Sequence, residues 1–108
     1  MKILRTLLVT SAIAGTAGAL AIPASAASTV KVTATSMKFK ISGSAHAGSV
    51  TFVVTNQDTL PHDFAIGGKN TGVIAKGKTK RLTVTLKKGK AAYRCTLHPA
   101  MKGTLTVS

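Results

Sequence analysis

The chain has 108 residues, with 15 lysines and arginines against 2 acidic residues and a formal net charge of +13. This length is enough for one small domain, and the single cysteine excludes an internal disulfide. With three phenylalanines, one tyrosine and no recognisable nucleic-acid-binding motif, the charge does not predict binding to nucleic acid; it fits a soluble surface, an acidic protein partner or an anionic envelope surface.

The N-terminal segment has the pattern of a signal peptide. Lys2 and Arg5 precede an apolar run from Leu7 to Leu20, and residues 24–26 (Ala-Ser-Ala) provide the small residues that a signal peptidase recognises. A membrane anchor fits less well, because spanning a bilayer needs about 20 apolar residues and this run contains two glycines and two threonines. We therefore expect residues 1–26 to be a cleaved signal peptide, with export to the periplasm or the extracellular space.

The mature chain, residues 27–108, is expected to form one domain. Losing the two basic residues of the leader leaves 13 basic residues against Asp58 and Asp63, a net charge of +11. A free thiol is vulnerable to oxidation outside the cytoplasm, and a domain of this size has only a modest core. A bound metal would protect the thiol and stabilise the folded state.

Nearly every segment of the mature chain alternates apolar and polar residues with period two. Valine and threonine are abundant, and glycine-rich turn signals separate the segments, as in a β-sandwich of seven or eight short strands. The expected strands cover residues 29–35, 37–41, 49–55, 62–66, 81–86, 91–95 and 103–107. Within the second of these, Met37 alternates with Phe39 and Ile41 and is expected to lie in the core.

Three metal-capable side chains lie close together near the C-terminus. Cys95 ends an expected strand, and His98 and Met101 follow in a turn closed by a glycine. His62 begins another expected strand, so two strand ends at one end of a sandwich would bring it to the same turn. Two imidazoles, one thiolate and one weak thioether are the ligands of blue-copper electron-transfer sites.

Other functions of these residues are less consistent with the sequence. Zinc could use the same four ligands, although structural zinc usually takes more thiolates and no methionine. Cys95 with His98 lacks an orienting third residue and a substrate cleft, so a thiol enzyme is not expected. Haem attachment needs a second cysteine, which the chain lacks. A multicopper oxidase needs paired His-x-His clusters, and the sequence has none. His46, in a turn without other ligands, is expected to be an exposed loop histidine.

Two stretches of the chain resemble the cupredoxins, the single-domain blue-copper family. Residues 47–66 (AGSVTFVVTNQDTLPHDFAI) are similar to the family's strand, asparagine-containing loop and first ligand histidine. Residues 93–107 (YRCTLHPAMKGTLTV) are similar to its ligand loop and last strand, and the C-x₂-H-x₂-M spacing is closest to that of amicyanin. The resemblance implies a Greek-key β-sandwich that holds one copper ion.

The same resemblance implies a role for each site residue. The ring Nδ of His62, the sulfur of Cys95 and the ring Nδ of His98 would form a trigonal plane around copper, with Met101 as a long axial ligand. Asn56 resembles the family's loop asparagine. Asp63 stands where the family often has asparagine; its carboxylate could accept backbone N–H groups of the ligand loop, and its charge should favour the oxidised state.

The resulting prediction is an exported blue-copper protein that carries single electrons by Cu(II)/Cu(I) cycling and is not an enzyme. The alternative is an envelope protein for copper delivery or scavenging on the same fold. We expect a monomer whose acidic redox partner docks near His98, on an apolar patch made by Leu97, Pro99 and Ala100. An anionic envelope surface is the other expected partner.

Overall fold

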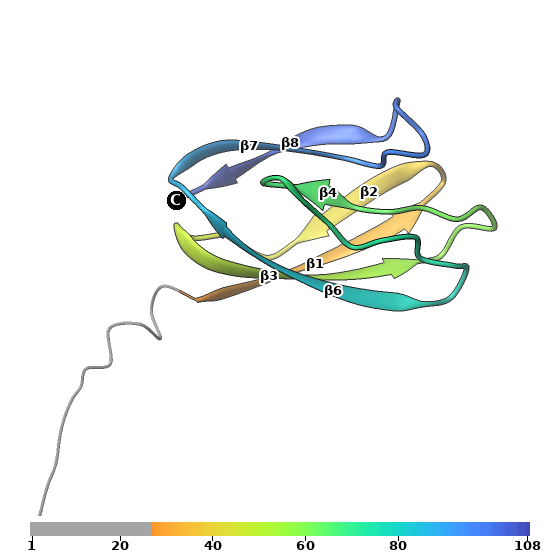
Figure 1. Cartoon of the computed structure of the whole chain (residues 1–108), viewed down its shortest axis with the longest axis horizontal. Coiled ribbons are helices and arrows are strands. Elements are labelled where there is room, and N and C mark those ends of the chain that lie inside the picture. The colour runs from red at the N-terminus through yellow and green to blue at the C-terminus, as the bar shows by residue number, and fades with distance from the viewer. Residues whose placement is uncertain (1–26) are drawn as a thin grey trace, which may run out of the picture.

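The computed structural model describes residues 27–108, so the predicted signal peptide lies outside the described residues. Within this range no helix is long and apolar enough to cross a membrane. Eight strands form two four-stranded sheets that pack face to face (Figure 1). The strands are β1 (Ser28–Thr35), β2 (Lys38–Ser42), β3 (Gly48–Asn56), β4 (Ala65–Ile66), β5 (Lys69–Asn70), β6 (Thr79–Leu86), β7 (Gly89–Arg94) and β8 (Lys102–Val107). The predicted all-β sandwich of seven or eight strands is confirmed.

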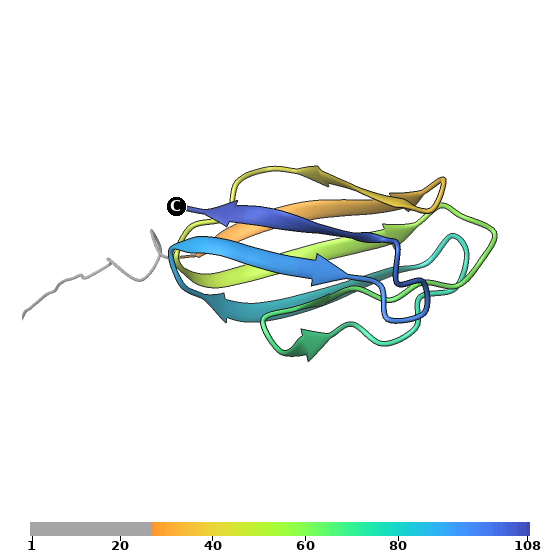
Figure 2. The ribbon, with the colours of Figure 1, turned by 90° about the horizontal axis from the view of Figure 1, so that it is seen from above.

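The two sheets have different strand orders. The first has the order β2-β1-β3-β6, in which β1 and β3 pair in parallel and the other neighbours are antiparallel. The second has the order β5-β4-β7-β8 and is antiparallel throughout. Figure 2 looks onto the outer face of the second sheet, where β7 and β8 run side by side.

Alternation along the strands builds the core between the sheets. In β1, Val30 and Val32 are buried while Lys31 between them is exposed, and β3 repeats the pattern. Rings from both sheets meet in the middle: Phe64 contacts Phe39 edge-on, with ring centroids 5.2 Å apart. The inner faces are therefore apolar, and the lysines and threonines remain on the outer faces.

The expectation that Met37 lies in the core was wrong. Ser36 and Met37 form the two-residue turn between β1 and β2, with φ angles of 52° and 58°, and Met37 is 40% exposed. Both central residues of such a turn have positive φ, which matches the twist of the flanking strands. The alternation of residues 37–41 therefore begins only after the turn, at Lys38.

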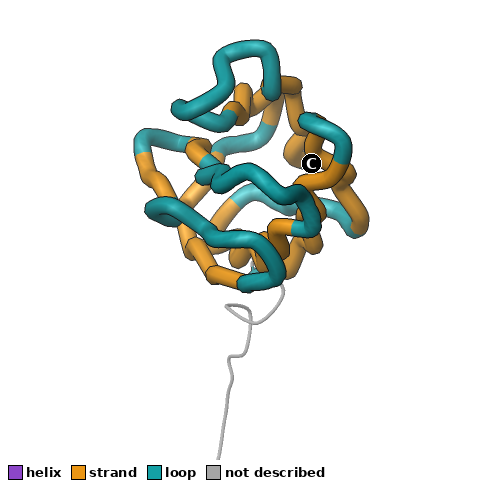
Figure 3. The backbone as a smooth tube through the Cα atoms, turned by 90° about the vertical axis from the view of Figure 1, so that its right-hand side faces the viewer, coloured by secondary structure: helices purple, strands orange, loops and turns teal. Residues whose placement is uncertain are grey.

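One end of the sandwich carries four loops, which we call the loop pole. They comprise residues 36–37, 57–64, 71–78 and 95–101, and Figure 3 looks directly onto this end. The strand expected over residues 62–66 is shorter than predicted, because only Ala65 and Ile66 form β4. His62 instead lies in the loop, held by an isolated antiparallel bridge to Ile74.

Candidate metal centre

The loop that follows β7 is closed by its own backbone. The Cys95 N–H donates to the Met101 carbonyl at 2.9 Å, and the Met101 N–H donates to the His98 carbonyl at 2.8 Å. The first bond pairs the residues that directly follow β7 and directly precede β8. Three potential ligand residues are therefore confined to one tight turn between adjacent strands.

The loop that carries His62 is organised by Asn56, which is fully buried. Its side-chain N–H groups donate to the carbonyls of Leu60, at 2.9 Å, and Ile74, at 2.8 Å. Its amide oxygen accepts the Asp58 N–H at 2.8 Å. Asn56 thus satisfies buried backbone groups of two loops and fixes the path of the chain toward His62.

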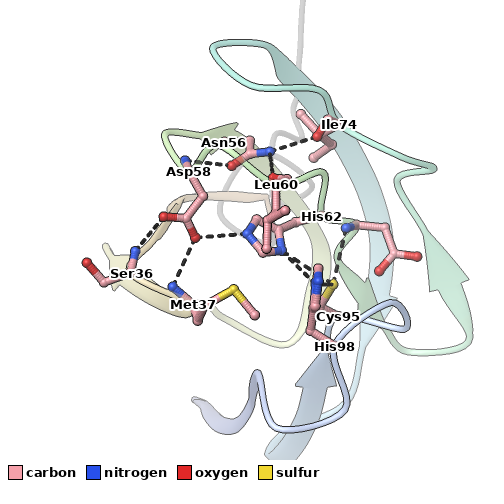
Figure 4. Close-up of polar contacts among 10 residues, drawn as sticks. Ser36, Met37, Asn56, Asp58, Leu60, His62, Ile74, Cys95 and His98 are labelled. Atoms are coloured by element: carbon pink, nitrogen blue, oxygen red, sulfur yellow. Dashed lines mark hydrogen bonds and ion pairs between the residues drawn. The ribbon is translucent and has the colours of Figure 1, made fainter.

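The structure brings His62, Cys95 and His98 together, with their donor atoms within 4.8 Å of one another. The Nδ1 atoms of His62 and His98 lie 3.1 Å apart (Figure 4). Cys95 Sγ lies 3.8 Å from His62 Nδ1 and 3.6 Å from His98 Nδ1. His62 and Cys95 are buried, whereas His98 is half-buried. Both rings thus direct the same nitrogen toward one thiol, as ligands around a single ion would.

Met101 lies beside this triad in the protein interior. It is 2% exposed and packs in a small cluster with Cys95 and Ala34, against which Phe39 also packs. A buried thioether next to a buried thiol offers a soft donor in surroundings that exclude water. The arrangement suits a metal that accepts sulfur as well as imidazole.

Asp63 connects the His62 loop to the cysteine loop. Its carboxylate accepts a backbone N–H of the ligand loop, as the sequence predicted. Its carboxylate accepts the Thr96 N–H at 2.6 Å, an N–H of Asn70 at 3.0 Å, and the Thr96 hydroxyl. The Asp63 N–H points at Cys95 Sγ, 3.4 Å away. Burial alone would raise the pKa of Asp63, but these hydrogen bonds outweigh it and lower the pKa below its ordinary value.

This lowered pKa predicts how stability changes in acid. A carboxyl with a depressed folded-state pKa stabilises the protein above its unfolded pKa of about 3.9, and loses that contribution as the pH falls through the folded value. The free energy of unfolding of the metal-free protein should therefore exceed that of Asp63→Asn by its full amount at pH 5 and above. Below about pH 4 the stability difference between the two proteins should shrink. At its steepest, the ratio of their unfolding equilibrium constants should change by about tenfold per pH unit. A difference that stays constant down to pH 2 would contradict this role.

Asp58 is a site residue that the sequence analysis missed. Its Oδ2 lies 2.8 Å from His62 Nε2, the ring nitrogen that faces away from Cys95. The same carboxylate accepts the N–H groups of Ser36, at 2.6 Å, and Met37, at 2.9 Å (Figure 4). The Met37 N–H is the main reason that the pKa of Asp58 is lowered, against desolvation, and the His62 ring adds to the effect.

The consequence for His62 is a defined orientation. When the carboxylate accepts a hydrogen bond from Nε2–H, the neutral ring keeps Nδ1 without a proton, and the lone pair of Nδ1 faces Cys95 and His98. The only signals in the sequence were that Asp58 is one of two acids and precedes His62 by four residues. The predicted exposed histidine, His46, lies far from this site and forms a 2.7 Å contact with the Ser108 hydroxyl.

A family model described as a cupredoxin-like domain matches residues 4–107 of the chain. The chain belongs to the cupredoxin family. The predicted resemblance is thereby confirmed, and so is its closeness to amicyanin, which recurs among the similar solved structures. No curated protein sequence matches this cupredoxin.

The solved structures similar to this cupredoxin share its fold. A reduced tryptophan-to-tyrosine mutant of amicyanin is 22% identical with a TM-score of 0.57, over 74% of this chain and 82% of that chain. A reduced Cu(I) form, at pH 4, of a proline-to-glycine mutant of amicyanin is 25% identical with a TM-score of 0.57 over the same shares. An oxidised methionine-to-leucine mutant is 22% identical with a TM-score of 0.56, over 73% of this chain and 81% of that chain.

Copper, one ion per chain, is the cofactor of this cupredoxin fold, and the residues present fit it. Two imidazole nitrogens, a buried thiol and a buried thioether form a donor set of mixed softness. Calcium and magnesium would require oxygen ligands instead. The side chains of His62, Cys95, His98 and Met101 could all serve as ligands.

Proposed function

We propose that this cupredoxin is an exported carrier of single electrons. His62 Nδ1, Cys95 Sγ, His98 Nδ1 and the Met101 thioether would hold the copper ion. The observation that carries the proposal is the convergence of two Nδ1 atoms and one sulfur within 3.1–3.8 Å of one another. Bound copper would supply a reversible change between Cu(II) and Cu(I).

The protein's own contribution is to hold the ligands still. Cys95 and Met101 are joined by a backbone hydrogen bond, while Asp63 and Asp58 fix the cysteine loop and the His62 ring. Ligands held in one arrangement rearrange little when the charge of the ion changes, which favours fast electron transfer. His98 is the ligand nearest to solvent, so its ring edge is the proposed path for the electron.

The surface around His98 supports docking of a protein partner. The exposed large apolar side chains of residues 27–108 all lie on the loop pole: Met37, Leu60, Val73 and Leu97, with exposed fractions of 40–53%. Pro99 and Ala100 are also exposed beside His98. An apolar patch on an otherwise basic protein is typical of an interaction surface. A positive field would then steer an acidic redox partner toward it.

Electrostatic steering predicts a salt dependence. Electron transfer to the true partner should slow as ionic strength rises, because exposed charges are screened beyond about 8 Å at physiological salt. Lys102→Glu should slow the reaction further at low salt and leave the visible spectrum unchanged, in stopped-flow mixing. Lys88→Glu is the matched control, since Lys88 lies in the β6–β7 turn at the opposite end. A rate that is flat or rises with salt would remove the acidic partner from the proposal.

The proposed Met101 ligand predicts a change of reduction potential without loss of colour. Met101→Leu removes a weak donor and keeps His62, Cys95 and His98, so the copper-loaded protein should remain intensely coloured. The reduction potential should rise, because a drier site with one donor fewer disfavours Cu(II). Cyclic voltammetry of the wild-type and variant proteins measures the shift. A colourless variant, or one with a lower reduction potential, would contradict the proposed role of Met101 as a weak ligand.

Copper delivery or scavenging is the second candidate function. It is favoured by the exposed thioether of Met37, which lines a small cavity together with Phe39, Ala100 and Met101. A delivery protein should release copper to a competing chelator within seconds and could bind more than one ion per chain. An electron carrier should bind one ion and release it slowly, which a stopped-flow chelator assay distinguishes.

A further inference from the structure

A groove outside the candidate metal centre lies on the outer face of the second sheet. It has a volume of about 760 Å³ and is lined by Lys69, Arg94 and Lys102 above a floor of small residues, Ala65, Ala92 and Thr104. We call it the basic groove. The floor is concave because only alanine and threonine side chains face outward between the longer cations on β4, β7 and β8, the face turned to the viewer in Figure 2.

Two of the three cations of the basic groove oppose each other directly. Arg94 on β7 and Lys102 on β8 are cross-strand partners. Like charges in this position destabilise a sheet. In all other strand pairs of residues 27–108, no two charged residues face each other. The one exception, Arg94 and Lys102, lines the basic groove.

No carboxylate within the described residues neutralises these cations. Both acidic side chains of the mature chain are already engaged, Asp58 with His62 and Asp63 with Thr96 and Asn70. The one ion pair found in residues 27–108 joins Asp58 and His62. The basic groove therefore presents three positive charges that an external anion could pair with.

We propose that the basic groove binds carboxylates of an acidic protein partner. Arginine suits this role because its planar guanidinium can bind a carboxylate through two parallel hydrogen bonds. A concave floor of small side chains accommodates a peptide segment, whereas a flat anionic bilayer would touch only the projecting lysines. Assigning the partner a redox role rests on the proposed function, but the binding itself does not.

The position of the groove links it to the candidate metal centre. Arg94 directly precedes Cys95, Lys102 directly follows Met101, and Thr96 also lines the groove. A partner held there would lie beside the ligand loop, with its charged segment on the sheet and its apolar surface against the loop pole. The groove would then set the orientation in which His98 meets the partner.

A hexaglutamate peptide, titrated at low salt into the ¹⁵N-labelled mature protein, tests the binding. Amide shifts should saturate and be confined to the groove, around Lys69, Arg94 and Lys102. The double variant Arg94→Gln with Lys102→Gln should weaken binding at least about tenfold, because two charge-assisted contacts are lost. Its metal-free form should be no less stable to denaturant than wild type, because a like-charge pair is removed.

The matched control is Lys31→Gln with Arg81→Gln. These residues flank Val53 on the outer face of the other sheet and are also one lysine and one arginine, so net charge changes equally. The control should bind the peptide nearly as well as wild type. Equal weakening by both double variants, or shifts spread over both sheets, would overturn the proposal.

Anionic phospholipid vesicles provide the second arm of the test. If the groove variant loses vesicle binding but keeps peptide binding, the surface recognises a membrane and the proposal is wrong. Both double variants should develop the same colour with Cu(II) as wild type. A wild-type protein without that colour would contradict the proposed electron carrier but not the groove, whereas a coloured protein without localised peptide binding would contradict only the groove.

Discussion

Replacing Cys95 by serine should abolish the intense visible absorption of the copper-loaded protein. That absorption arises from charge transfer between a thiolate sulfur and Cu(II), and Cys95 is the chain's one thiol. Serine is close in size to cysteine and its hydroxyl can still accept the Asp63 N–H, so the fold should persist. The expected result is therefore a folded protein whose visible band falls essentially to baseline.

Two measurements make the Cys95→Ser result decisive. Elemental analysis of the dialysed variant shows whether copper is still bound, which separates loss of the thiolate from loss of the ion. Denaturant unfolding of the metal-free proteins shows whether the sandwich is intact. A variant that keeps full colour with one bound copper would exclude Cys95 as the ligand.

Replacing Asp58 by asparagine should lower copper affinity by about 10–100-fold, the usual cost of removing a group that orients a metal ligand. The two oxygens of Asp58 accept three N–H groups, from His62, Ser36 and Met37. An amide has one oxygen and one NH₂ group, so in either orientation its NH₂ faces at least one of these donors. The reduction potential should also rise, because a neutral amide stabilises Cu(II) at His62 less than a carboxylate does.

Asp58→Glu is the control, because it keeps the carboxylate and should recover part of both effects. The tautomer of the neutral His62 imidazole gives a measurement that does not depend on copper. It can be read from the ring ¹⁵N chemical shifts of the metal-free protein. Nε2–H should predominate in wild type and lose its dominance in Asp58→Asn. Unchanged affinity, potential and tautomer in Asp58→Asn would show that the Asp58–His62 contact has no positioning role.

The strands and the candidate ligands were predictable because each leaves a local signal. Period-two alternation marks β1, β3 and β6 directly, and the ligand spacing after Cys95 is confined to seven residues. The contact of Asp63 with the cysteine loop followed from its position beside His62. These features depend on neighbours in sequence or on a resemblance in a short motif.

The features that escaped prediction depend on contacts between distant segments. Met37 continues the apolar alternation of the following strand, and no glycine marks its left-handed turn, which the side chain of Asp58 supports from 21 residues away. The sequence predicts that His62 begins a strand. In the structure His62 lies in a loop, which Asn56 holds through hydrogen bonds to the Leu60 and Ile74 carbonyls. Opposition of Arg94 and Lys102 requires the register of β7 and β8, which a sequence alone does not provide.

Titration of the metal-free mature protein with Cu(II), followed by its visible spectrum, is the decisive test of a blue-copper site. We expect an intense sulfur-to-copper charge-transfer band that grows linearly and stops at one copper per chain. The band should disappear on reduction and return on reoxidation, as a one-electron carrier requires. Copper that binds without an intense band, or a band that does not recover after a redox cycle, would contradict the proposed electron carrier.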